Sequence, residues 1–94
     1  MILSYRDKRT AAFASREDVP AFRGIEKQTW KRLRILGAAI NLNVLRAVRS
    51  NRLEALKGDR AGQYSIRIND QWRICFKWAR GSLGPTDVEI VDCH

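Results

Sequence analysis

The sequence predicts an α+β domain, with an N-terminal strand and two helices packed on one face of a curled, mainly antiparallel sheet. In the N-terminal half, apolar residues recur at three- and four-residue steps, and between residues 64 and 78 they recur at every second residue. The 94 residues suit one domain, 1–94, with an ordinary 45% of hydrophobic residues. Because so short a chain encloses little volume, we expect an active site on an open face or in a shallow groove.

The N-terminal half predicts one strand and two helices. Residues 2–5 are interpreted as a short strand, and Asp7 is a candidate N-cap for a brief helix that follows it. A longer helix is predicted from Asp18 as N-cap, with Pro20 tolerated in its first turn. The positions that share its apolar face are Phe22, Ile25, Thr29, Leu33, Leu36 and Ile40.

A basic stripe follows the opposite face of that helix. Residues 21–52 contribute +7 of the net charge of +8, and Glu26 is the single acid among them. The stripe is either a solvated outer face or a surface that follows phosphates, and composition does not separate the two. Its members are Arg23, Lys27, Lys31 and Arg34.

The C-terminal half predicts a run of antiparallel strands. After Asn41 the helical period ends, and we expect an irregular or short helical connection. Asn69 and Asp70 favour a tight turn between two alternating segments. The expected elements are a strand over 53–56, a turn with Gly58 and Gly62, a hairpin over 64–78 and a last strand over 87–91.

The alternation of the hairpin predicts a basic open face. If Trp72, Ile74, Phe76 and Trp78 face the helices, the residues between them face outward. Such an array can hold a phosphodiester, although exposed cations also simply keep a sheet face soluble. The residues expected there are Arg67, Arg73, Cys75 and Lys77, with Lys57 and Arg60 nearby from the preceding turn.

His94, the single histidine, is the side chain best suited to move a proton at neutral pH. Asp92 has the same strand parity. The alternative is a solvated chain end, and parity favours that alternative, because Val88 and Ile90 share it and are expected to face the core.

Cysteine usage and the N-terminus predict a cytoplasmic protein. Cys75 and Cys93 lack the spacing of a disulfide framework or of a zinc site, so we expect neither a bound metal nor a cofactor. The N-terminal apolar run is too short for a signal sequence or a membrane span.

Two segments, 53–76 and 88–94, resemble the central and terminal blocks of HigB-type toxins, also called plasmid maintenance killer proteins, of the RelE/ParE superfamily. They cover about a third of the chain. The resemblance implies a RelE-like fold and the toxin of a type II toxin–antitoxin system, a metal-independent endoribonuclease that cuts messenger RNA on the ribosome and inhibits translation. The implied partners are a HigA-like helix-turn-helix antitoxin and the ribosome with bound messenger. Operator DNA is contacted only through the antitoxin, and no membrane is involved.

The resemblance also implies residue roles. It assigns catalysis to Lys57, Arg73, Asp92 and His94. In the family a tyrosine commonly precedes the final histidine, and Cys93 stands there in this chain. A cysteine neither stacks on a base nor donates a proton as a tyrosine does. The residues expected to contact RNA are Arg60, Arg67, Lys77, Cys93 and the basic stripe of Arg23, Lys27, Lys31 and Arg34.

Two alternatives remain open at this stage. A ParE-like toxin inhibits DNA gyrase through protein contacts and needs no cationic phosphate site. A non-catalytic basic protein that binds RNA or the ribosome would explain the charge equally well. Substitution of His94 distinguishes a nuclease from these alternatives. A nuclease should lose its toxicity while it still binds the ribosome.

Overall fold

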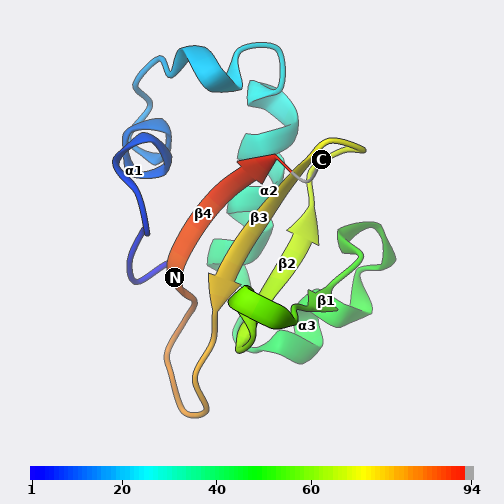
Figure 1. The fold of residues 1–94 in the computed structure, drawn as a ribbon. Helices are drawn as coiled ribbons and strands as arrows, with labels where there is room; N and C mark the ends of the chain where they lie inside the picture. Colours follow the sequence, from blue (N-terminus) through cyan, green and yellow to red (C-terminus); the bar gives the residue numbers. More distant parts are fainter. Residues whose placement is uncertain (93–94) are drawn as a thin grey trace.

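The computed structural model describes residues 1–92 and confirms the α+β prediction. Within these residues, an antiparallel sheet of four strands has α2 behind it and α1 beside its β4 edge (Figure 1). The elements are α1 (Lys8–Ala14), the 3-10 helix η1 (Pro20–Phe22), α2 (Glu26–Ala38), α3 (Leu42–Ala47), the 3-10 helix η2 (Arg49–Asn51), β1 (Glu54–Ala55), the 3-10 helix η3 (Gly58–Arg60), β2 (Gln63–Arg67), β3 (Trp72–Lys77) and β4 (Thr86–Asp92).

The sheet is a meander in which each strand pairs with its neighbours in sequence, in the order β1-β2-β3-β4. The β2–β3 hairpin is confirmed, because Asn69 Oδ1 accepts hydrogen bonds from the backbone N–H groups of Gln71 and Trp72, both at 2.8 Å. The last strand is also confirmed and extends one residue beyond the prediction at each end. The alternation of apolar and polar residues therefore predicted both strands of the hairpin correctly.

The expected strand over residues 2–5 is reduced to one parallel bridge, between Tyr5 and Val88. The segment still runs beside β4, since Leu3 N donates to Pro85 O at 2.9 Å. A regular ladder does not form because Asp87 has a φ of 51° and β3–β4 pairing shifts register nearby.

The predicted helix from Asp18 to Ile40 is wrong at both ends. Gly24 has a φ of +91°, which separates η1 from α2, so α2 begins only at Glu26. Asp18 caps no helix and instead accepts from Arg23 Nη2 at 2.5 Å, and this hydrogen bond lowers the pKa of the Asp18 carboxyl. Ile40 lies beyond the helix and is 77% exposed.

A third helix, α3, occupies part of the connection that follows. Asn41 caps it, because its side chain accepts from Val44 N at 3.0 Å. Leu45 is the buried residue of this helix.

The core lies between the helices and one face of the sheet. Ile66, Ile74 and Ile90 are registered across β2, β3 and β4 and are fully buried. Phe22 contacts the Trp72 ring edge-on, with ring centroids 5.6 Å apart. Burial of each such side chain contributes about 1.5–3 kcal/mol. The predicted apolar parity is thus correct, and it leaves the other sheet face for polar residues.

None of the helices within residues 1–92 has the length and apolar character that a membrane crossing requires.

Candidate active site

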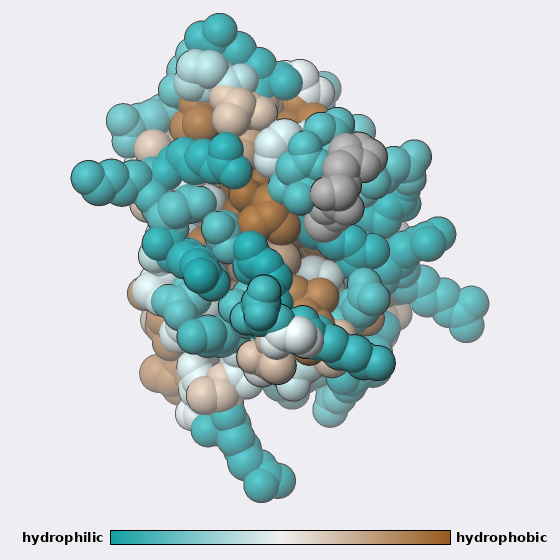
Figure 2. Space-filling model, viewed as in Figure 1, coloured by the Kyte–Doolittle hydropathy of each residue, from teal (hydrophilic) through white to brown (hydrophobic). Residues whose placement is uncertain are grey.

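The sheet face opposite α2, called the open face below, carries the cations that the alternation predicted. Arg67 pairs with Arg73 in the β2–β3 register, and Lys77 pairs with Gln63. The short helix η3 lies over this face (Figure 1). Figure 2 shows the face as mainly hydrophilic side chains around a narrow hydrophobic strip.

Cys75 departs from the prediction, since it shares this parity but is buried. It is a short side chain on an inner strand, registered between Ser65 and Glu89. It is therefore not part of the exposed basic array.

Arg73 is held by two partners through one nitrogen. Its Nη1 donates to Ser65 Oγ at 3.0 Å and lies 3.2 Å from Glu54 Oε2. The Arg73 side chain is 25% exposed and that of Glu54 is 60% exposed. The guanidinium is thus fixed on the face while part of it still reaches solvent.

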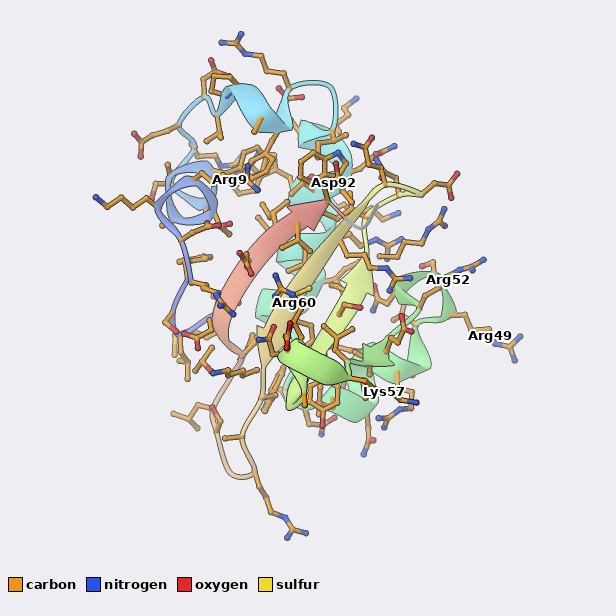
Figure 3. The ribbon with its side chains drawn as sticks, viewed as in Figure 1. Arg9, Arg49, Arg52, Lys57, Arg60 and Asp92 are labelled. Carbon is orange, nitrogen blue, oxygen red and sulfur yellow. The ribbon has the colours of Figure 1, made fainter. Side chains whose placement is uncertain are left out.

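Arg60 reaches from η3 across the open face toward β4 (Figure 3). Its Nη1 donates to Gln63 Oε1 and to Glu89 Oε1, both at 3.1 Å. Glu89 also pairs with Arg6, whose Nε lies 3.8 Å from the same oxygen. This group of two guanidinium ions and one carboxylate keeps a net positive charge.

Of the other cations predicted for this face, two form ion pairs with aspartates and one does not. Arg67 is paired with Asp70, and Lys77 Nζ lies 3.3 Å from Asp87 Oδ2. Lys57 precedes η3, and its ammonium group has no ion-pair or hydrogen-bond partner within residues 1–92. Lys57 is therefore the most readily available cation of this group.

Asp92 is not brought among these cations. It lies at the far end of β4 (Figure 3), where it pairs in register with Trp72 and so has the parity of the helix-packed face. Its side chain is exposed, and its Oδ2 accepts from Gln71 Nε2 at 2.9 Å. Cys93 and His94 lie outside the described residues.

The basic stripe is shorter than predicted. Lys27, Lys31 and Arg34 are exposed on α2, and their side chains have no ion-pair or hydrogen-bond partner in the described part of the chain. Arg23 lies outside α2 and is bound to Asp18, so it is not part of the stripe. Because α2 lies behind the sheet, the stripe and the open face are on different sides of the molecule (Figure 1).

Sequence reasoning missed the residues that hold the arginines. Strand parity alone could have placed Gln63, Ser65 and Glu89 on the open face. Their pairing with Arg60 and Arg73 could not be predicted, because it depends on which strands are neighbours and on where η3 lies.

The cations of the open face do not line the hollow that is described next. A hollow of about 710 Å³ lies elsewhere, between the start of α3 and the β3–β4 connection, with Tyr64 and Trp78 in its wall. None of the predicted site residues lines it. Within residues 1–92, no cluster of three or more His, Cys, Asp or Glu side chains has an arrangement that could bind a metal ion.

Comparison with known proteins adds an independent finding. The family described as the RelE-like toxin of the type II toxin–antitoxin system HigB matches residues 3–94. Toxin HigB-1 of Vibrio cholerae serotype O1 is 35% identical to this chain over 85 residues, which cover 86% of this chain and 87% of the relative.

Proposed function

The chain belongs to the HigB-like family of RelE-like toxins of type II toxin–antitoxin systems, which cleave messenger RNA in a ribosome-dependent manner, and we propose that it does so through its open face without a metal ion. The observation that carries this proposal is the pair of arginines fixed on the face. Arg60 and Arg73 each use one nitrogen for protein contacts. The remaining N–H groups of both guanidinium ions have no partner within residues 1–92 and can bind phosphate oxygens.

The proposed reaction is an intramolecular transesterification, which leaves a 2′,3′-cyclic phosphate on one RNA fragment and a 5′-hydroxyl on the other. The 2′-oxygen loses its proton and attacks phosphorus, the bond from phosphorus to the 5′-oxygen breaks, and that oxygen takes a proton. Arg73 and Lys57 stabilise the negative charge that builds on the phosphoryl oxygens. The family resemblance, rather than the position of Asp92 at the end of β4, assigns the proton transfers to Asp92 and His94, with Cys93 between them in sequence.

The exposed position of these cations on one face of the sheet explains why a ribosome would be needed. A free RNA strand gains little orientation from a few surface cations, whereas a codon held on the ribosome already has a fixed backbone. Arg67 and Lys77 then add contacts on either side, and the three exposed α2 cations contribute docking. We therefore expect poor activity on free RNA.

Membership in a toxin–antitoxin family implies an antitoxin partner. We propose that this partner is a HigA-like helix-turn-helix protein in the cytoplasm. It would connect the toxin to operator DNA, which the toxin itself does not read.

The test is a cell-free translation reaction with purified protein, in which cuts in a defined messenger are mapped by primer extension. Wild type, Arg73→Ala and His94→Ala are compared, with Arg80→Ala as a control for loss of one exposed charge. The proposal expects cuts only within translated codons, strongly reduced in the first two variants and retained in the control. An intact messenger, with growth still arrested in cells, would contradict it and favour a gyrase inhibitor. Ribosome binding without any cut would favour a non-catalytic protein.

A further inference from the structure

Arg60 and Arg73 are held on the open face by the same arrangement of partners. In each case Nη1 contacts one neutral side-chain oxygen on β2 and one carboxylate oxygen on an edge strand, β4 for Arg60 and β1 for Arg73. The neutral oxygens belong to Gln63 and Ser65, both buried and two positions apart on β2. Such positions lie about 6.6 Å apart and point to the same face, so the two arginines are anchored side by side.

The two carboxylates differ in burial. The Glu89 side chain is 17% exposed, against 60% for Glu54. Glu89 also lies between two guanidinium ions, those of Arg60 and Arg6. A less hydrated carboxylate with two cationic partners fixes its neighbours more strongly than an exposed ion pair does.

The side-chain contacts of Arg60 add to the backbone hydrogen bond from Leu56 N to Gln63 O, which closes the connection that contains η3. None of the residues of η3 is buried, and Gly58, its first residue, and Gly62, which follows its C-cap, have φ angles of +63° and +91°. Within residues 1–92, the hydrogen bonds from η3 side chains to the sheet are those of Arg60. Loss of the acceptor on β4 would leave Arg60 with Gln63 alone, and the guanidinium would then be free to turn about that single contact.

We propose that Glu89 is a positioning residue of the site: it fixes the Arg60 guanidinium over the open face for the messenger. This role rests on the proposed nuclease function. Glu89 does not touch RNA and transfers no proton. It acts by removing the rotational freedom of Arg60, whose Nε and Nη2 donors remain for a phosphate.

The first measurement is steady-state cleavage on translating ribosomes by wild type, Glu89→Ala and Glu89→Gln. We expect kcat to fall by roughly tenfold or more in Glu89→Ala, with KM changed by less than about threefold, because misplacement acts mainly on the transition state. Glu89→Gln keeps an acceptor oxygen and should recover much of the loss. Glu17→Ala removes the same charge at an exposed site outside the sheet and should match wild type. An unchanged kcat in Glu89→Ala, or a loss of equal size in Glu17→Ala, would overturn the role.

A double-variant test separates positioning from general destabilisation. In a chain that already carries Arg60→Ala, the addition of Glu89→Ala should reduce kcat no further, since the residue to be positioned is gone. Additive losses would contradict the proposal. Thermal unfolding of every variant shows whether a loss of activity is a loss of folded protein.

A second readout does not depend on cleavage. Nuclear magnetic resonance of the guanidinium groups in the free toxin, with the Arg60 signal assigned by the Arg60→Lys variant, reports rotation of Arg60. Slow rotation in wild type that becomes fast in Glu89→Ala supports the role of Glu89, and unchanged rotation refutes it. If wild type cuts no messenger, the nuclease function fails while this spectrum still decides whether Glu89 fixes Arg60.

Discussion

The open face and the outer face of α2 carry the same types of cation but hold them differently. On the open face, Arg60 and Arg73 are paired with acids and also bonded to oxygens of β2. On α2, the side chains of Lys27, Lys31 and Arg34 have no such partners within residues 1–92. The two faces therefore carry similar charges, but only the open face holds its guanidinium groups in fixed positions before any ligand binds.

Preorganisation separates catalysis from docking. A guanidinium that is already fixed stabilises developing charge without reorganising during the reaction. A mobile lysine on a helix surface instead attracts phosphates over a distance, and salt weakens its effect. If this division holds, substitutions on the open face lower the rate of cleavage, whereas substitutions on α2 weaken only ribosome association.

Arg73→Ala should have the largest effect. Loss of one fixed donor to a transition-state oxyanion typically costs about 10²- to 10³-fold in rate, and we expect a loss in that range in single-turnover cleavage on programmed ribosomes. Arg73→Lys should restore little, because an ammonium group lacks the planar fork. A loss below about fivefold would remove the distinction between the two faces.

The Ser65→Ala substitution tests whether the hydrogen bond from Arg73 to the Ser65 hydroxyl contributes to catalysis. Ser65 is fully buried and its Oγ accepts from Arg73. We expect the single-turnover rate to fall by roughly tenfold, while chemical denaturation shows a loss of about 1 kcal/mol in the free energy of unfolding. A wild-type rate at that stability would mean that Glu54 alone fixes the arginine.

Single alanine substitutions of the three α2 cations should reduce ribosome association by only a few-fold. The slope of log affinity against log salt should fall by about 0.7–0.9 for each cation that contacts a phosphate. The single-turnover rate at saturating ribosome should not change, since these residues act on docking. A large loss at saturation would place catalysis on α2 and contradict the comparison.

Asp18→Asn provides the smallest effect and tests pairing outside the site. Arg23 holds the pKa of Asp18 below its usual value, so the pair stabilises the fold above the pKa of an unfolded aspartate, near 3.9, and this contribution is lost as pH falls through the lower folded pKa. The small difference in thermal midpoint between wild type and Asp18→Asn should therefore disappear in acid, with cleavage unaffected. A persistent difference would point to a role other than the ion pair.

Much of the sheet and part of the site followed from the sequence. Period-two alternation was sufficient to place Arg67 and Arg73 on one face, because parity is a local property of a strand. The start of α2 was not predictable from apolar spacing. That spacing continues through Phe22 and Ile25, while Gly24 in the left-handed region interrupts the backbone.

The anchors of the site needed information that a sequence does not carry. Glu54 and Glu89 lie on β1 and β4, at opposite edges of the sheet, and each reaches an arginine from another element. The exposure of a side chain also did not follow from its position in the strand alternation. Cys75 has the outward parity but is buried, because it lies on an inner strand between Ser65 and Glu89.

The bridge between Tyr5 and Val88 has a consequence for how the chain reaches its folded state. The hairpins of the meander join neighbours in sequence and can form early, whereas this bridge and the contact of Arg6 with Glu89 close a loop of nearly the whole chain. During synthesis, the N-terminal segment is made before β4, so it has no strand to pair with until the residues around Val88 have been made. Glu89 lies on the same late strand, so its ion pairs with Arg6 and Arg60 are among the last contacts of the fold to form.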